Sequence, residues 1–388
     1  MFSRRSSFER EPNRIHRALE QALLDPRELV DLTLSNPTDA GLPYAGERIR
    51  GALGGPDVLH YEPAAFGLEL ARQAVVEELG RDGICLVPER VLLTASTSEA
   101  YGYAFALLCD PGDAVLVPAP SYPLLDHLAR LASVRLVPYR LAYDGAWHID
   151  VPSLRQAMAA EQPKAVFTVS PNNPTGHCLK RSELEALEEL ALPIVSDEVF
   201  ARYPLKEDRA RVKSALEATR TLVLALGGLS KLAALPQLKL SWMLLGGPDA
   251  LVEEARARLE VIADAHLSVA APVQHALAEL FTATRETVEA IRVRTRGNLE
   301  RLRGLARDAP LSVLDVEAGW YAVLRVPRVL SEEDWVIELL SQARVRVQPG
   351  YFFDFVEEPF LVVSLLCPED SFGRGARALV RHVRNRAA

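Results

Sequence analysis

The hydrophobic positions of this chain follow two different patterns along its length. From about residue 68 to 245, short β-branched apolar runs alternate with longer stretches of helical periodicity. The runs are RVLLT, AVLVP, VRLVPY, AVFTVS, LPIVSDEVF, TLVLAL and LSWMLLGG. This alternation is typical of a mainly parallel sheet with helices on both faces. We therefore predict an α/β fold built on a seven-stranded, mainly parallel sheet.

Beyond this region the pattern changes to long amphipathic stretches. Residues 249–267 and 286–307 have the periodicity of two long helices, which suit a connection between domains. The tail predicts strands at YAVLRVP, VRVQPG and FLVVSLL and helices at EDWVIELLSQA and RGARALVRHVR, with the N-terminal helix RIHRALEQALL beside them. We expect a large domain over residues 45–270 and a smaller α+β domain formed by residues 1–44 and 271–388.

Charge and cysteine content narrow the possible functions. The 388 residues carry a formal net charge of -8, which gives no broad positive field for nucleic acid or an anionic bilayer. No apolar run approaches the ~20 residues that a membrane-spanning helix needs. The four cysteines lack the C-x-x-C spacing of metal or redox sites, so we expect a reduced, cytoplasmic protein without a metal.

Polar residues follow several of the predicted strands, at the edge where an open parallel sheet binds its ligands. Ser96 and Glu99 follow RVLLT with the spacing of a capping box, which leaves first-turn N–H groups free for a phosphate. PNNPTG holds Asn173 in a stiff turn, and Asp197 ends an apolar strand. Tyr122 follows VLVPAP and could stack on a planar ring. Taken singly, each feature could equally be an ordinary cap, turn or core residue.

Lys231 is the most informative residue of the chain. Only six lysines occur, and Lys231 and Lys239 lie in an apolar segment, LALGGLSKLAALPQLKLSWMLL, with no carboxylate within several residues. An unpaired buried ammonium is costly, and burial lowers the pKa of lysine toward that of a nucleophile and base. A lysine for an imine, a carboxylate for a pyridine nitrogen, an aromatic ring and a phosphate seat together match the needs of pyridoxal 5'-phosphate.

With these motifs in order, the sequence resembles the class I/II aminotransferases, pyridoxal-phosphate enzymes of fold type I, from about Leu32 to Val380. PNNPTG, DEVF and SKLAALPQLK are similar to that family's signatures. The resemblance implies that Asn173 bonds the cofactor's phenolic oxygen, Asp197 the pyridine nitrogen, and that Lys231 forms the Schiff base. Lys239 stands where the family has a phosphate-binding arginine. The full implied cofactor set is Lys231, Asp197, Asn173, Tyr122, Ser96, Thr97, Lys239, Ser230, Tyr61 and Phe200.

The resemblance also implies an assembly. Tyr61, in HYEPAAFG, resembles the tyrosine that reaches the phosphate of the partner subunit's site, so a homodimer is expected. Ser96 and Thr97 correspond to the phosphate loop and Tyr122 to the ring-stacking position.

Three positions depart from the family pattern. Phe200 replaces a tyrosine that bonds the phenolic oxygen, and Gly228 replaces a phosphate-binding serine. Val362, in FLVVSLL, occupies the place of the arginine that binds the substrate's α-carboxylate. We therefore hypothesise a substrate that is not a common α-amino acid, or an unusual carboxylate site. Candidate substrate contacts are Asn36, Trp320 and Arg346, with Gln348 and Arg202 as further possibilities.

The resemblance implies an aminotransferase that moves an amino group between an amine or amino acid and a keto acid in a ping-pong cycle, with Lys231 as the proton carrier. The same scaffold could instead serve a lyase, a decarboxylase or a C–C bond-forming enzyme, or a non-catalytic regulatory protein. A dehydrogenase is excluded, because the G-x-G-x-x-A match at Gly373, Gly375 and Ala378 follows no first βα unit and lies ten residues from the end.

Overall fold

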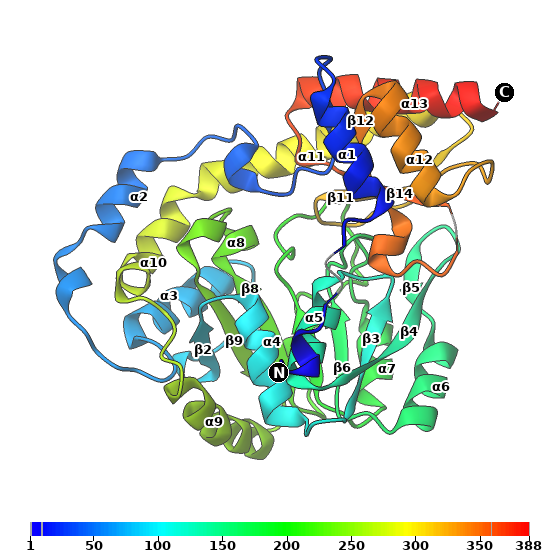
Figure 1. Cartoon of the computed structure of the whole chain (residues 1–388). Helices are drawn as coiled ribbons and strands as arrows, with labels where there is room; N and C mark the ends of the chain where they lie inside the picture. Colours follow the sequence, from blue (N-terminus) through cyan, green and yellow to red (C-terminus); the bar gives the residue numbers. More distant parts are fainter. Residues whose placement is uncertain (1, 9–10, 358, 388) are drawn as a thin grey trace.

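A large mixed sheet forms the centre of the molecule in this computed structural model, which describes residues 2–8, 11–357 and 359–387 (Figure 1). Its eight strands lie in the order β2-β9-β8-β7-β6-β3-β4-β5. They are β2 (Val91–Thr94), β3 (Ala114–Ala119), β4 (Arg135–Tyr143), β5 (Trp147–Ile149), β6 (Val166–Val169), β7 (Ile194–Asp197), β8 (Val223–Gly228) and β9 (Ser241–Gly246). Six strands run parallel, and β9 and β5 run antiparallel to their neighbours.

The seven predicted strands all form, but the predicted count is one short. The additional strand, β5, pairs Tyr143 with Trp147 in a hairpin with β4, and Gly145 takes a positive φ of 115° in the connecting turn. A strand of three residues is too short to leave a clear alternating pattern in the sequence.

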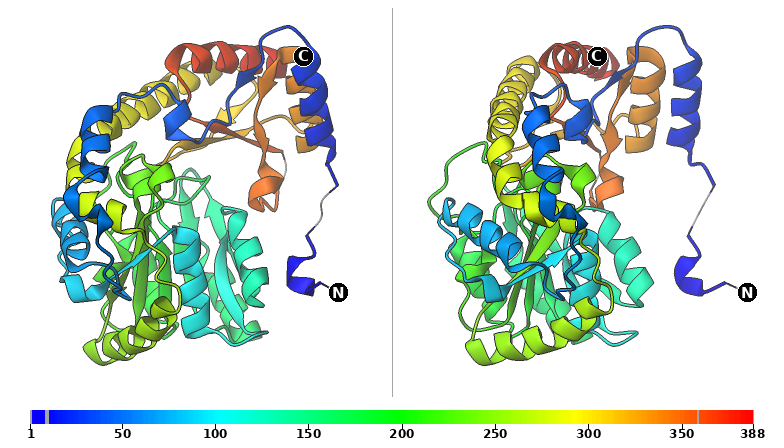
Figure 2. Two further views of the ribbon diagram at one scale, coloured as in Figure 1. Left: turned by 60° about the vertical axis from the view of Figure 1, so that its left-hand side comes forward. Right: turned by 90° about the vertical axis from the view of Figure 1, so that its left-hand side faces the viewer.

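Helices cover both faces of this sheet, as the sequence predicts (Figure 2). Successive residues of a strand point to opposite faces. Val195 accordingly packs in an apolar cluster with α4 (Thr97–Leu108) and α9 (Asp249–Asp264), whereas Ile194 packs with α6 (Val151–Glu161) and α7 (Arg181–Glu188). The other helices around the sheet are α3 (Glu69–Gly80), α5 (Leu124–Ala132) and α8 (Leu229–Leu232).

A smaller unit, built around a four-stranded sheet of order β10-β11-β14-β13, lies above the carboxyl edge of the large sheet in Figure 1. Its strands are β10 (Ser312–Val313), β11 (Tyr321–Arg325), β13 (Gln348–Pro349) and β14 (Phe360–Ser364), and β1 (Val30–Asp31) pairs with β12 (Val345–Arg346) beside it. Its helices are α1 (Arg14–Leu24), α12 (Glu332–Glu338), a π-helical turn η7 (Leu339–Ala343) and α13 (Glu369–Ala387).

Of the two long helices predicted as a connection between domains, the second, α11 (Arg285–Ala306), joins the units, whereas the first, α9, packs against α4 on one face of the large sheet. The helix α11 packs along α13, while α10 (Ala271–Ala283) packs against α2 (Gly46–Leu53) and α3. We retain the division into residues 45–270 and 1–44 with 271–388 as a proposal, and note that α10 shares an apolar cluster with α3 through Leu277 and Phe281. Short 3-10 turns complete the chain: η1 (Arg4–Ser6), η2 (Pro37–Asp39), η3 (Pro56–Leu59), η4 (Pro88–Arg90), η5 (Ala215–Glu217), η6 (Pro236–Leu238) and η8 (Gly350–Phe353).

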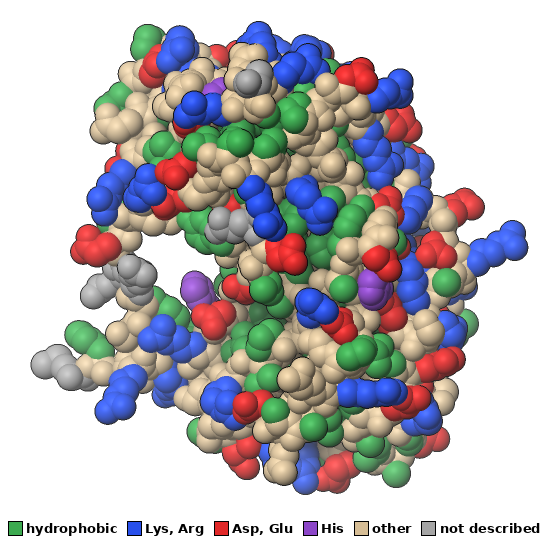
Figure 3. All heavy atoms as spheres, turned by 90° about the vertical axis from the view of Figure 1, so that its right-hand side faces the viewer, with side chains coloured by type: hydrophobic (Ala, Val, Ile, Leu, Met, Phe, Trp, Pro, Cys, Tyr) green, Lys and Arg blue, Asp and Glu red, His purple; other side chains and the backbone are tan. Residues whose placement is uncertain are grey.

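On the face shown in Figure 3, acidic and basic side chains are interspersed over both units. Among the described residues, no helix is long and apolar enough to cross a membrane.

Candidate active site

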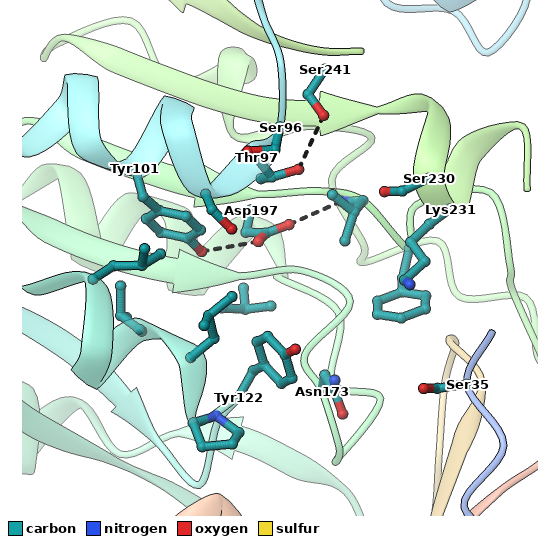
Figure 4. Close-up of a pocket in the computed structure, with 18 of the residues that line it drawn as sticks. Ser35, Ser96, Thr97, Tyr101, Tyr122, Asn173, Asp197, Ser230, Lys231 and Ser241 are labelled. Carbon is teal, nitrogen blue, oxygen red and sulfur yellow. Dashed lines mark hydrogen bonds between the residues drawn. The ribbon is translucent and has the colours of Figure 1, made fainter. Parts of the chain in front are cut away.

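A cavity of about 630 Å³ lies at the carboxyl edge of the large sheet, bordered by the small unit. The turns after β2, β3, β6, β7 and β8 contribute to it, and so does the first residue of β9. It brings together most of the residues that the sequence singles out (Figure 4). Those lining it are Ser96, Thr97, Tyr122, Asn173, Asp197, Phe200, Ser230, Lys231, Lys239 and Gln348.

Lys231 reaches the cavity from α8, the single helical turn that follows β8 (Figure 4). Two glycines end β8 because β9 lies very close there: a Cβ at Gly227 would come within 2.4 Å of Trp242 Nε1. Burial lowers the pKa of Lys231, and the negative charge of Asp197 opposes this in part. Within the described part of the chain, Lys231 makes no ion pair. The amine is therefore available in its neutral, nucleophilic form over a wider pH range than an exposed lysine.

Asp197 is the last residue of β7 and lies deep in the cavity. Its carboxylate accepts hydrogen bonds from the Tyr101 hydroxyl at 3.0 Å and from the Val199 N–H at 3.1 Å. Burial raises the pKa of Asp197, and these two bonds lower it in part. The two donors fix the carboxylate in one orientation, in which it can accept a proton-bearing group of a ligand.

The N-terminus of α4 forms the predicted anion seat. Ser96 Oγ accepts from the Glu99 N–H at 3.1 Å, and Glu99 in turn accepts from the Ala95 N–H at 2.7 Å, so the expected capping pair is present. This helix of 12 residues directs its first N–H groups toward the cavity, where a phosphate is favoured.

A hydroxyl that the sequence reading did not single out completes this seat. Ser241 Oγ lies 3.5 Å from Thr97 Oγ1 (Figure 4). A Cβ at Gly228 would fall 2.2 Å from Ser241 Oγ. The hydroxyl of Ser241, which pairs with Gly228 across β8 and β9, therefore occupies the space that a serine side chain at position 228 would take.

Asn173 and Tyr122 lie on the other side of the cavity (Figure 4). Asn173 is buried, and its Oδ1 has no hydrogen-bond partner among the described residues. An unpaired buried amide oxygen is costly, so a bound ligand that satisfies this amide would be stabilising. Together with the buried Asp197, the free amine of Lys231 and the anion seat, this amide fits a pyridoxal phosphate.

Several candidate residues do not line the cavity. Asn36 accepts hydrogen bonds within its own turn, from the Thr38 N–H at 3.1 Å, and its neighbour Ser35 lines the cavity instead. Trp320 is buried behind Lys231, whose amine lies 5.4 Å from its ring centre. Arg346 pairs with Asp31, Arg202 with Glu78 and Asp82, and Tyr61 lies on an exposed segment at a second, separate pocket.

One residue at the cavity that the sequence analysis did not identify is Tyr101, which donates a hydrogen bond to Asp197. Tyr101 lies on an apolar helix, where a tyrosine is usually a core residue, although it follows Thr97 by four positions and therefore lies on the same helix face.

Phe200 takes its expected place and contacts Trp320 edge-on, with ring centres 5.2 Å apart. Among the described residues, no group of His, Cys, Asp and Glu could hold a metal ion.

Comparison with known proteins identifies the family. The model of aminotransferase class I and II matches residues 27–379. The chain is 26% identical over 372 residues to the glutamate-pyruvate aminotransferase AlaA of Haemophilus influenzae, covering 90% of each chain. It is 30% identical over 201 residues to the S-alkyl-thiohydroximate lyase SUR1 of Arabidopsis thaliana, a match covering 50% of this chain and 43% of that protein.

The fold agrees with solved structures. An alanine aminotransferase from Pyrococcus furiosus superposes with a TM-score of 0.88 at 22% identity, covering 99% of this chain and 100% of the other. The expected fold type I architecture is thereby confirmed. Because the family model spans nearly the whole chain, this protein belongs to the class I and II aminotransferases and is a pyridoxal-phosphate-dependent aminotransferase.

Proposed function

We propose that Lys231 bonds the cofactor and carries the proton in a ping-pong transamination. The supporting observation is that Lys231 and Asp197 enter one cavity, with the anion seat of α4 beside them. When bound, pyridoxal phosphate supplies a carbonyl that exchanges for the substrate's amine and a ring that accepts an electron pair.

The other proposed roles rest on the family resemblance and are supported by the positions of the residues around the cavity. Asp197, oriented by Tyr101 and Val199, holds the pyridine nitrogen protonated. Ser96, Thr97, Ser230, Ser241 and Lys239 hold the phosphate, Asn173 bonds the phenolic oxygen, and Tyr122 stacks on the ring. Phe200 lines the cavity where the family has a tyrosine, and it would supply no hydroxyl to the phenolic oxygen.

The chemical step needs a base that is neutral when it takes the proton and that stays next to the reacting carbon. The lowered pKa of Lys231 meets the first requirement, and its fixed position at the start of α8 meets the second. In the overall reaction the donor's C–N bond breaks and its carbon is oxidised by two electrons to a carbonyl, with water supplying the oxygen; the cofactor, when bound, would hold the amino group and the electron pair between the two half-reactions. A second carbonyl compound, such as a keto acid, reverses these changes.

A homodimer is part of this proposal. Tyr61 is 71% exposed and Leu59 is 93% exposed, on a segment outside the cavity of its own chain. Exposed apolar side chains of this size are common at interfaces, and they support the idea that Tyr61 reaches a partner's phosphate seat. The four free cysteines, Cys85, Cys109, Cys178 and Cys367, support a reducing, cytoplasmic location.

The test is the visible absorption spectrum of the holoenzyme beside Lys231→Ala. A band in the wild type alone, bleached by an amino donor and restored by a carbonyl acceptor, would support the proposal. A parallel assay without the carbonyl acceptor distinguishes a lyase from an aminotransferase, because a lyase would release product continuously. A wild-type spectrum that does not depend on Lys231 would refute the assigned role.

A further inference from the structure

We propose that this enzyme uses primary amines that carry no carboxylate on the amine-bearing carbon in preference to α-amino acids. The proposal rests on the proposed function and names its substrate class. Because donor and acceptor occupy the same cavity, the preference extends to aldehydes and ketones over keto acids. It is carried by the distribution of charge around the cavity.

The cations that line the cavity all serve to bind the cofactor. Among the described lining residues, the cations are Lys231 and Lys239, and none is an arginine. Lys231 is the reacting amine. Lys239 is two residues before Ser241, whose hydroxyl lies beside Thr97 at the anion seat. Once the cofactor is bound, Lys231 would be bonded to it and the positive charge of Lys239 would face the phosphate, so that neither is left for a substrate carboxylate.

The side of the cavity that the small unit and the N-terminal segment supply is neutral. We call it the neutral wall: it consists of Ser35, Tyr321, Gln348, Phe352 and Phe353. In Figure 4, Ser35 lies on the Lys231 side of the cavity, away from Tyr101. Burial raises the pKa of Tyr321, and a hydrogen bond with Ser35 opposes this in part, so the phenol stays neutral at physiological pH.

The strand behind this wall offers no cation either. Val362 of β14 stands opposite Gln348 in the strand register and is fully buried. It packs in an apolar cluster with Val323 and Phe353. The alternate residues Leu361 and Val363 point into the core of the small unit.

Nearby arginines already have partners. Arg346 lies 3.0 Å from Asp31, and Arg202 lies 2.7 Å from both Glu78 and Asp82. Moving Arg346 to the cavity would remove the ion-pair partner of Asp31, and moving Arg202 would remove that of Asp82 and one partner of the buried Glu78, which also pairs with Arg81 at 3.4 Å.

A substrate carboxylate against this wall would lose its water and gain only neutral partners. The loss of a charge-assisted pair typically weakens binding by about one hundredfold. A neutral substituent pays no such penalty, and the aromatic rings of Phe200, Phe352 and Phe353 offer apolar contact to the rest of the substrate. The cavity therefore favours an aromatic or aliphatic amine.

The experiment compares three matched donors with the purified holoenzyme: 2-phenylethylamine, L-phenylalanine and L-phenylalaninamide. Single-turnover bleaching of the Lys231-dependent band gives a second-order rate constant for each, corrected for the fraction of neutral amine. We expect the amine and the amide to react about one hundredfold faster than phenylalanine. The amide separates the effect of charge from that of size.

Two variants at one position sharpen the result. Gln348→Arg places a cation on the neutral wall and should raise the rate with phenylalanine by about tenfold or more, while the uncharged control Gln348→Met should not. If Gln348→Arg fails to fold, the comparison of the three donors with the wild-type enzyme still tests the proposal. Phenylalanine reacting as fast as the amine or faster would overturn the inference and leave the proposed function intact. If the wild-type holoenzyme shows no absorption band that depends on Lys231, the proposed function is refuted, and the inference with it.

Discussion

The two sides of the cavity differ in origin and in charge. The cofactor end, formed by Asp197, Lys231, Ser96, Thr97 and Ser241, comes from the large sheet and carries the charged groups. The neutral wall comes from the N-terminal segment and the small unit, and its polar groups are uncharged. This difference indicates that the large sheet determines which chemistry the enzyme performs, while the small unit determines which molecules undergo it.

The substitution Asp197→Asn should have the largest effect on activity of the changes considered at the cofactor end. It keeps the size of the side chain but removes the charge, and its amide group cannot accept from both Tyr101 and Val199. We expect kcat/KM to fall by about a thousandfold, the range typical for loss of a preorganised charge. Steady-state kinetics with saturating cofactor would measure it.

The control for this prediction is Tyr101→Phe, which keeps the carboxylate and removes one of its donors. We expect it to lower kcat/KM by about tenfold, because one hydrogen bond to a charged group is lost. A loss with Tyr101→Phe as large as that with Asp197→Asn would show that orientation, and not charge, is what Asp197 contributes.

The cofactor end was largely predictable from the sequence, for a geometric reason. Asp197 ends a parallel strand, Asn173 and Ser96 each follow one, and the carboxyl ends of parallel strands meet at one edge. Ser241 escaped this reasoning because β9 is antiparallel, so that its amino end lies at the same edge. Strand direction is a property of the assembled sheet and is not visible in the run LSWMLLGG.

The neutral wall was less predictable. Ser35, Tyr321 and Phe353 come from segments far apart in the chain and meet through packing of the small unit on the large one. The sequence pointed to the right segment at Asn36, but the turn η2 directs that side chain to Thr38 and leaves Ser35 at the cavity. The arginine candidates form ion pairs with acidic residues that are far away in the sequence and that only the fold brings close.

Glu198, which follows Asp197 but does not line the cavity, provides a pH-dependent test of the stability of the large unit. Burial raises the pKa of Glu198 from 4.5 to about 7, although Ala215 N–H and Ser196 donate to it. The folded state then binds the proton more tightly than the unfolded chain, so this group's stabilising contribution is full below pH 4.5 and is lost as the pH rises to about 7. At about 1.4 kcal/mol per pH unit, the loss is about 3 kcal/mol.

The substitution Glu198→Gln is neutral at every pH and can still accept from both donors. We expect its unfolding free energy to match that of the wild type at pH 4.5 and to exceed it by about 3 kcal/mol at pH 8. Chemical denaturation at several pH values measures the difference between the two proteins. A difference that does not change with pH would contradict the raised pKa.

A serine at position 228 tests the hydroxyl exchange at the anion seat. In Gly228→Ser the new Cβ would lie 2.2 Å from Ser241 Oγ, so one of the two side chains has to move. We expect a cost of about 2 kcal/mol from overpacking, and cofactor affinity lower by about thirtyfold. Fluorescence titration of the apoenzyme with pyridoxal phosphate measures the dissociation constant.

The double variant Gly228→Ser with Ser241→Gly should recover most of that affinity, because it moves the hydroxyl from β9 to β8 and opens the space it needs. Ser241→Gly alone should lose about 1 kcal/mol of binding through the missing hydrogen bond. If the double variant binds no better than Gly228→Ser, the two positions do not share one hydroxyl site.

The smallest expected effect is that of Lys239→Arg. Lys239 is exposed, has a φ of 50° and lines the cavity beside β9. A guanidinium offers a phosphate two parallel hydrogen bonds where the ammonium offers a point charge, so we expect cofactor affinity to rise by about fivefold, or about 1 kcal/mol. The same substitution should leave the ratio of rates for phenylethylamine and phenylalanine unchanged, because this cation serves the cofactor end. A gain in phenylalanine use with Lys239→Arg would mean that charge at one end of the cavity acts on substrates at the other, and the two sides would no longer be separate in function.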